Sequence, residues 1–421
     1  MINIKKLCYM ALPFVFLPTV ILSQEVTLRN LIESAEVNNG QILSSKLQAS
    51  SKESQSSAIE RSYIPTVDIG ASYTQLNPTA GFSPKKTTSG FVIVGLEVFD
   101  GGRKRAQLEA SRFAHQAALF NSQGIVLGVT LDIINRYYIL QQQEAFLVAL
   151  KTKTNELQAQ LERLESFMRA GLAMQDEVDR LKAALEDSRY QIEAMKLDIV
   201  TSQENLWVKT GIRPTKMSKD SIITPKAISL EPSPQVQQML ALSQELKEQS
   251  NMVKASQLPQ VVLQNKYSVS NYKGIPETGF GDDFFVDKQN ALSATASMRI
   301  FDGGKTAKEK EALHYQHLSL ESQKEYLLQE QQSQFLIATK RLETLKSQLK
   351  STQSALKASQ SNYESVTGKF EAGIVDYVTY LDALSGTIES EVRHQKAIYD
   401  YEIAKALYYY YAGKNPKEYI K

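Results

Sequence analysis

Cysteine is nearly absent from this chain of 421 residues, and the single one is Cys8. It lies in an apolar run, residues 7–22, that follows two lysines and ends in small and polar residues, which is the layout of a cleaved secretory signal. Two prolines interrupt the run, so it is poorly suited to spanning a bilayer of about 30 Å. We therefore expect residues 1–23 to be removed, which leaves a chain without disulfides or thiolate chemistry.

Net charge is lacking as well. The predicted signal holds two of the 48 basic residues and none of the 46 acidic ones, so the mature chain is balanced at 46 of each. This balance excludes the strongly basic face that a nucleic-acid-binding protein needs. No stretch of 18 uninterrupted apolar residues follows Leu22, so any part of the mature chain that crosses a membrane is expected to be a β-barrel.

Side chains that carry catalytic or metal chemistry are few. The four histidines all fall in segments with helical periodicity, and none stands in a metal-ligand or nucleophile pattern. His314 and His317 are three residues apart and share one helical face, but no acidic or thiolate partner follows at a matching spacing. We therefore predict that the chain is not an enzyme and has neither a cofactor nor a metal site.

An internal duplication organises what the sequence does contain. VFDGG at 98–102 returns as IFDGG at 300–304, and the same offset of 202 residues relates Gly171 to Gly373. Upstream of the FDGG motif the offset falls to 194, so the second copy holds eight more residues there. We predict a first structural repeat over 24–215, a linker or equatorial segment over 216–233, and a second repeat over 234–421.

Each repeat is predicted to run through a helix, a strand pair, a long helix and a return helix. The strand pairs fall at 63–99 and 258–301, where apolar and polar residues alternate: Val67, Ile69 and Tyr73, for example, share one face. Strands of about ten residues with this alternation are typical of a transmembrane barrel. A soluble antiparallel sheet that packs on one face would show the same pattern.

After each FDGG the apolar period changes to 3.5 residues, which is the spacing of a coiled-coil seam. We predict long helices over 103–168 and 305–370, and return helices over 174–209 and 376–411. Each long helix would measure roughly 100 Å at 1.5 Å per residue. Because a single globular core cannot bury so long a stripe, we expect the helical hairpins to pack side by side into a tube.

The strand pairs, the FDGG turns, the hairpins broken at Ala-Gly and the duplication together resemble the TolC-like outer-membrane efflux proteins, over essentially all of the mature chain. The resemblance implies an α+β membrane protein and a homotrimer in the outer membrane of a Gram-negative bacterium. Each protomer would give four strands to a 12-stranded transmembrane β-barrel, surrounded by outer-membrane lipid, and its antiparallel coiled-coil hairpins would form a periplasmic α-barrel.

The function implied by the resemblance is that of a passive exit duct in a tripartite efflux or type I secretion system. Its partners would be a periplasmic adaptor, also called a membrane fusion protein, and an inner-membrane RND or ABC transporter. Two alternatives are a periplasmic coiled-coil adaptor and a structural envelope protein. An adaptor would share the hairpins, but it would not need two strand pairs or a duplication of the whole chain.

Two groups of candidate residues lie where strands meet helices. Asp100 and Asp302 stand at the turns, where each carboxylate can cap free N–H groups at the start of the next helix. Glu97 and Arg299 are equivalent under the 202-residue offset and face the proposed lumen, where they would pair, line the pore or be two solvated charges. The glycines expected to permit the sharp bends are Gly101, Gly102, Gly303 and Gly304.

Gly171 and Gly373 are predicted to end the long helices in a left-handed conformation. In the family that the chain resembles, this end is the periplasmic tip, which meets the adaptor and closes the channel. By the resemblance, the adaptor contacts are assigned to Gly171, Leu172, Gly373 and Ile374.

The same resemblance assigns a gate of acidic residues near the tip. The segment AGIVDYVTYLDA keeps Asp382 of the family motif, whose carboxylates would form a ring at the constriction; the alternative is an exposed acid on a helix face. Thr379 replaces an acidic residue of that motif, and the family's arginine two residues after the glycine is Val375 here, so the network that closes the gate must differ. The candidate gate residues are Asp382, Thr379, Asp376, Glu177 and Asp176.

Overall fold

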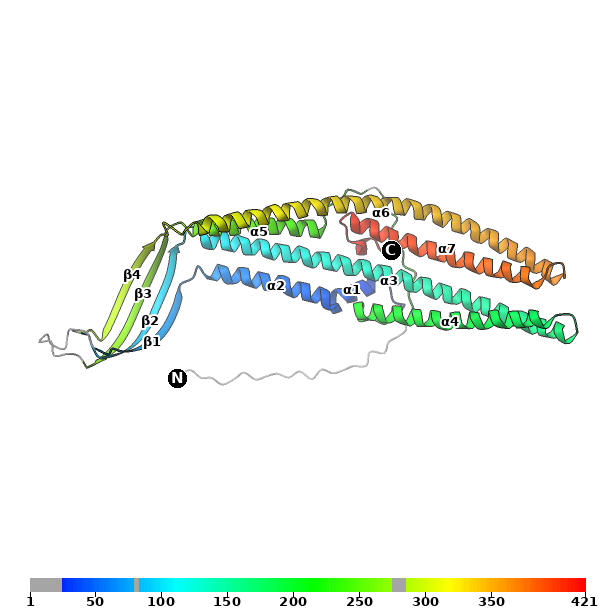
Figure 1. Cartoon of the computed structure of the whole chain (residues 1–421), viewed down its shortest axis with the longest axis horizontal. Coiled ribbons are helices and arrows are strands. Elements are labelled where there is room, and N and C mark those ends of the chain that lie inside the picture. The colour runs from blue at the N-terminus through cyan, green and yellow to red at the C-terminus, as the bar shows by residue number, and fades with distance from the viewer. Residues whose placement is uncertain (1–24, 79–82, 227, 275–284) are drawn as a thin grey trace.

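The computed structural model describes residues 25–78, 83–226, 228–274 and 285–421. The predicted signal, residues 1–23, lies outside this part. Figure 1 shows an elongated molecule in which a β-sheet occupies one end and helices run away from it along the long axis. The described chain therefore separates a sheet end from a helical end, with a core between them.

The two repeats contain the same order of main elements. The first repeat comprises α1 (Leu28–Asn38), α2 (Gly40–Arg61), β1 (Thr66–Gln75), β2 (Lys86–Phe99), α3 (Arg103–Arg169) and α4 (Gln175–Thr210). The second comprises α5 (Pro234–Ala255), β3 (Gln260–Lys273), β4 (Lys288–Ser297), α6 (Lys305–Glu371), α7 (Tyr377–Tyr411) and the short 3-10 helix η2 (Pro416–Tyr419).

The long helices α3 and α6 have 67 residues each and form antiparallel hairpins with α4 and α7 (Figure 1). Apolar side chains at heptad spacing hold the hairpin of α3 and α4 together. Leu157, Leu161 and Leu164 of α3 are buried in one cluster with Val178 and Leu181 of α4. This cluster also contains residues of α7, so the two hairpins of one protomer pack against each other toward the tips.

A second core lies around the middle of α3, where α1, the inter-repeat linker and the C-terminal segment meet. Ile133, Ile134, Tyr137 and Tyr138 of α3 are fully buried in it. By length and composition α3 is the one helix in the described ranges that qualifies to cross a membrane, but its central apolar residues pack inside this core. The Tyr137 hydroxyl donates to the carbonyl of Ser218, and burial raises the pKa of Tyr137 to about 12.

The four strands form one antiparallel sheet in the order β1-β2-β3-β4, so β1 and β4 are its open edges. The register places Ile69, Val92 and Tyr267 side by side on one face. The other face of the sheet is largely polar. Gly90, Asn265 and Asn290 also lie on the apolar face. Its apolar side chains are those of Val67, Ile69, Ala71, Tyr73, Val92, Val94, Leu96, Val261, Leu263, Tyr267, Val269, Leu292, Ala294 and Ala296.

The last strand ends earlier than the predicted boundary at residue 301. β4 stops at Ser297, because its ladder partner β3 begins at Gln260 and offers no backbone beyond that point. The following apolar side chains, Ile300 and Phe301, are 90% and 88% exposed in the single chain. In the first repeat, by contrast, β2 continues to Phe99, which pairs with β3.

Candidate functional site

Each strand-to-helix turn is built around an aspartate. Asp100 accepts hydrogen bonds from the backbone N–H groups of Gly102 (3.0 Å) and Lys104 (2.6 Å). Asp302 accepts the equivalent bonds from Gly304 (2.9 Å) and Thr306 (2.9 Å). The carboxylates therefore satisfy N–H groups that have no partner at a helix start. The four glycines that follow have positive φ: Gly101, Gly102, Gly303 and Gly304.

The two turns differ in what surrounds them. Glu97 does not pair with Arg299; it forms ion pairs with Arg103 (2.9 Å) and Lys104 (3.2 Å) of its own turn. Lys104 also donates to the carbonyl of Ser62, which ties α2 to the turn. Arg299 is exposed and lies beyond the end of β4, so it cannot occupy the position in the sheet that Glu97 has in β2.

At the opposite end of the molecule, both long helices stop in the same way. Gly171 and Gly373 have φ values of 75° and 72°. The N–H of Gly171 bonds to the carbonyl of Met168, and the N–H of Leu172 bonds to that of Phe167; the second hairpin repeats this pair of bonds. This is a Schellman motif, in which a left-handed glycine reverses the chain and the last helix carbonyls find donors.

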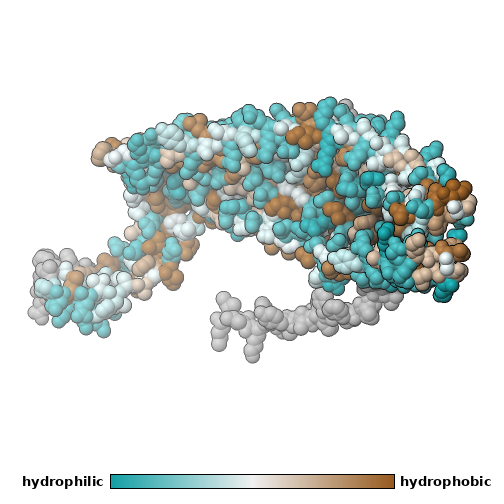
Figure 2. All heavy atoms as spheres, turned by 45° about the vertical axis from the view of Figure 1, so that its right-hand side comes forward, coloured by the Kyte–Doolittle hydropathy of each residue, from teal (hydrophilic) through white to brown (hydrophobic). Residues whose placement is uncertain are grey.

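The tips expose large apolar side chains. Leu172 and Ile374, the residues after the two glycines, are 77% and 71% exposed, and Met174 is 71% exposed. Figure 2 shows hydrophobic residues on the surface at this end of the hairpins. In a Schellman motif the residue at this position usually packs back onto the helix, so these side chains are left available for contact with another molecule.

Two of the predicted gate residues form a helix cap. Asp376 precedes α7 and accepts hydrogen bonds from the hydroxyl (2.5 Å) and the backbone N–H (2.9 Å) of Thr379. These bonds hold the pKa of Asp376 below its usual range. The carboxylate of Asp376 and the hydroxyl of Thr379 are therefore engaged with each other at the start of α7.

The other predicted gate residues lie in different surroundings. Asp176 forms an ion pair with Arg180 of the same helix (3.6 Å), and Glu177 accepts from the backbone N–H of Met174 (3.1 Å), which caps α4. Asp382 is exposed and has no ion pair with any residue in the described ranges. Among the five candidates, only Asp382 therefore presents a carboxylate that the protomer itself does not use.

Sequence reasoning missed an aromatic cluster just inside the tip, formed by Tyr363, Phe370, Tyr377 and Tyr380. Tyr380 of α7 is 1% exposed, its ring stacks on Phe370, and its hydroxyl lies 3.1 Å from that of Tyr363. That hydroxyl also accepts from Gln160 (3.3 Å) and donates to Glu156 (3.4 Å) of α3. Burial raises the pKa of Tyr380, so it stays a neutral donor. The cluster thus joins α7 to the first hairpin.

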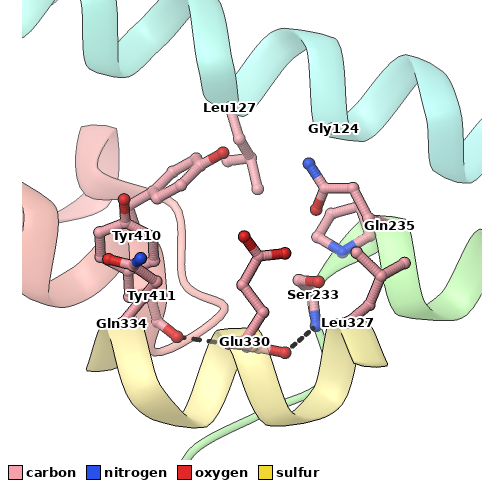
Figure 3. Close-up of a pocket in the computed structure, with 11 residues that line it drawn as sticks. Gly124, Leu127, Ser233, Gln235, Leu327, Glu330, Gln334, Tyr410 and Tyr411 are labelled. Carbon is pink, nitrogen blue, oxygen red and sulfur yellow. Dashed lines mark hydrogen bonds between the residues drawn. The ribbon is translucent and has the colours of Figure 1, made fainter. Parts of the chain in front are cut away.

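A cavity of about 240 Å³ lies between α3, the start of α5, α6 and the end of α7 (Figure 3). Its polar lining is partly committed to holding the linker: Gln331 accepts from the N–H of Ser233 and donates to the carbonyls of Glu231 and Tyr411. We therefore assign these contacts to the joint between the repeats. The lining residues are Gly124, Leu127, Ser233, Pro234, Gln235, Leu327, Glu330, Gln331, Gln334, Tyr410 and Tyr411.

The sequence model of the family described as Outer membrane efflux protein matches residues 31–211 and again residues 228–409. The chain belongs to this family. The two matched segments correspond to the two repeats, so the resemblance to outer-membrane efflux proteins is confirmed. No curated protein matches the sequence significantly.

Solved structures of outer-membrane proteins have the same fold. The Campylobacter jejuni CmeC outer membrane channel has a TM-score of 0.78 at 15% identity, with 92% of this chain and 86% of that chain covered. The outer membrane protein VceC from Vibrio cholerae has a TM-score of 0.77 at 14% identity, with 92% and 96% covered. The open state of the Neisseria gonorrhoeae MtrE outer membrane channel has a TM-score of 0.72 at 15% identity, with 92% of this chain and 89% of that chain covered.

Membership in the outer membrane efflux family supports transport rather than catalysis. Within the described ranges no group of three or more histidine, cysteine or acidic side chains is arranged to hold a metal ion. His317 is hydrogen-bonded to Ser243 through Nδ1 (3.0 Å), and Ser243 donates to Glu321. The histidine is thus part of a contact between α5 and α6.

The two turns of this efflux-family chain offer a matched pair of substitutions. Asp100→Ala is expected to lower the free energy of unfolding by about 1–2 kcal/mol, because it leaves N–H groups uncapped. Asp302→Ala is expected to lower the free energy of unfolding by less. Asp302 is more exposed than Asp100, which is 9% exposed, so water can replace the lost hydrogen bonds more easily there. Thermal unfolding followed by circular dichroism in detergent measures both variants; an equal loss would contradict the difference inferred from burial.

Proposed function

We propose that this member of the outer membrane efflux protein family is the passive exit duct of a tripartite export machine. The observation that carries the proposal is a sheet with one apolar face, joined end-on to two helical hairpins of about 100 Å. The sheet would lie in the outer membrane of a Gram-negative bacterium, and the hairpins would extend through the periplasm. Cargo would move through the assembly without an energy source in this chain.

The open edges of the sheet support assembly into a trimer. β1 and β4 each leave a row of backbone N–H and C=O groups without partners in one protomer. In lipid each such group costs several kcal/mol, so only a closed barrel satisfies them all. Pairing β4 of one protomer with β1 of the next, three times, gives a barrel of 12 strands from four-stranded sheets. The apolar face would meet lipid, and the polar face would line the lumen.

The helical part leaves surface that a trimer would cover. Tyr326, Leu336 and Ile337 of α6 are 64%, 61% and 54% exposed in the single chain. Hairpins that pack laterally around the barrel axis would bury these side chains against neighbouring protomers. The same lateral packing continues the wall of the β-barrel into a helical tube.

The hairpin tips would form the gate and the docking end. The aromatic cluster around Tyr380 ties the second hairpin to α3, so a change in the relative position of the two hairpins has to break its hydrogen bonds. Three copies of Asp382 would line the constriction and favour cations. The exposed Leu172 and Ile374 would contact a periplasmic adaptor, and an inner-membrane RND or ABC transporter would supply the energy.

Both alternative functions account for less of the molecule. A periplasmic adaptor would use the hairpins but leave the apolar face of a four-stranded sheet without a purpose. A structural envelope protein would not need tips that expose apolar residues. We therefore place the exit duct first.

Loosening the aromatic cluster is expected to open the gate. Tyr380→Phe keeps the stacked ring and removes the hydroxyl that links α7 to α3. If the lost hydrogen bonds stabilise the closed state by about 1 kcal/mol, the ratio of closed to open states should fall about fivefold per protomer. Channel conductance in a planar bilayer, and uptake of a large antibiotic by cells, should both rise.

Tyr190→Phe is the matched control, because Tyr190 of α4 is 71% exposed and its hydroxyl has no hydrogen-bond partner among the described residues. Wild-type conductance and uptake in the Tyr380→Phe channel would show that the cluster does not hold the gate.

The carboxylate ring is expected to set ion preference. Asp382→Asn removes three negative charges from a trimeric constriction while keeping side-chain size, so the preference for cations over anions should weaken. The reversal potential in a KCl gradient measures this preference directly. Asp198→Asn, which neutralises an exposed acid of α4, should leave it unchanged; an Asp382→Asn channel as cation-selective as the wild type would remove Asp382 from the constriction.

The partners are identified by crosslinking from the tip. Gln175→Cys places a thiol on the exposed first residue of α4, and the sequence has no other cysteine outside the predicted signal. Capture of an adaptor with an RND pump in living cells would support efflux, and capture of an ABC exporter complex would support type I secretion. Lys219→Cys, in the linker, serves as the control position. Recovery of neither complex from an accessible thiol would count against the exit-duct role.

A further inference from the structure

On the polar face of the sheet, the aromatic ring of Phe91 lies at an unusual place. Phe91 of β2 is the ladder partner of Gly70 in β1, and both lie on the face opposite to Ile69 and Val92. A Cβ atom added to Gly70 would come within 2.5 Å of Cζ and 2.7 Å of Cε2 of Phe91. Contacts this short do not occur between real atoms, so the ring lies flat across the strand only because residue 70 has no side chain.

The need for glycine here is steric. Gly70 is not among the glycines with positive φ, so an L-residue could adopt its backbone conformation. Covering a strand glycine with an aromatic ring from the neighbouring strand is a known way of stabilising a sheet. What Gly70 determines is therefore the direction of the Phe91 side chain.

A lysine on the third strand holds the ring from the other side. Nζ of Lys266 in β3 lies 4.8 Å from the centroid of the Phe91 ring, within the range of a cation–π interaction. Lys266 forms no ion pair with any residue in the described ranges. On the polar face, Ile93 of β2 is the ladder partner of Asp68 in β1 on one side and of Lys266 in β3 on the other. The ring is thus held against the sheet by Gly70 and Lys266.

We propose that Phe91 is the element that sets the bore of the barrel, and that Gly70 keeps it folded against the wall. The inference rests on the proposed function, because it takes the polar face as the lumen. In a trimer three rings would lie at one level of the barrel. Any side chain at position 70 would push each ring off the wall and toward the axis, where it would restrict the size of cargo that passes.

Labelling from outside the cell tests this independently of the periplasmic gate. Thr66→Cys places the only thiol of the mature chain on the polar face, between Phe91 and the helices. Intact cells are treated with a small maleimide or with a maleimide carrying a bulky polymer. In the Gly70→Ala background the bulky reagent should label Cys at position 66 several-fold more slowly than in the parent, while the small reagent should label both alike.

Three further backgrounds make the test specific. Gly90→Ala is the matched control: Gly90 lies on the apolar face, a Cβ there meets nothing within 4 Å, and labelling should not change. Gly70→Ala combined with Phe91→Ala should restore fast bulky labelling. Phe91→Ala alone should accelerate it, and this variant keeps the proposal testable if Gly70→Ala does not assemble.

The outcomes separate the inference from the function on which it rests. Bulky labelling that is unchanged in both Gly70→Ala and Phe91→Ala would overturn the role of Phe91. If the small reagent cannot reach position 66 from outside in the parent channel, the polar face is not an open lumen, and it is the exit-duct function that fails.

Discussion

The two open edges of the four-stranded sheet are the constraint on which the rest of the architecture depends. A sheet with an apolar face suits lipid only if no backbone group at its edges is left without a hydrogen bond. One protomer cannot meet that condition, because β1 and β4 lie at opposite ends of the strand order. In the proposed trimer, closure therefore belongs to the assembly, and each FDGG turn would have to project a helix in line with the barrel wall so that the helical tube closes as well.

Duplication supplied that turn twice, but the two copies have diverged in their surroundings. Both keep the aspartate and the left-handed glycines, since the backbone path requires them. Only the first copy adds Glu97 and Lys104, which fix α2 and β2 to the turn; the second has Arg299 and Thr306 at the equivalent positions. The turn beside Glu97 is thus fixed by side chains, whereas the turn beside Arg299 depends more on its backbone bonds.

The sequence predicts the parts of the structure that repeat along the chain. Heptad spacing and the 202-residue offset indicate helices over 103–168 and 305–370, and α3 and α6 differ from these bounds by one residue at their C-terminal ends. The sequence does not predict the contact of the aromatic cluster with the first hairpin. The hydrogen bond between Gln160 and Tyr380 depends on how one hairpin is rotated against the other. The ion-pair partners of Glu97 could not be predicted either. The 202-residue offset relates Glu97 to Arg299, whereas the Glu97 side chain pairs with Arg103 and Lys104 at the start of α3.

In the proposed exit duct, any movement at the gate has to be consistent with long helices that show no break. α7 is attached to the linker at its far end: Lys405, 4% exposed, donates to the carbonyl of Ile222 (2.5 Å), and the carboxylate of Glu402 accepts from the N–H of Ile222 (2.7 Å). Both bonds to Ile222 are short and involve a charged side chain, and charge-assisted hydrogen bonds are roughly twice as strong as neutral ones. The hydroxyl of Tyr380 has only longer bonds, of 3.1, 3.3 and 3.4 Å. The second hairpin therefore has a fixed point at the core and a weaker attachment near its tip. In the proposed exit duct, a tilt about this fixed point would open the tip without unfolding a helix, as a channel that is opened by a docking partner requires.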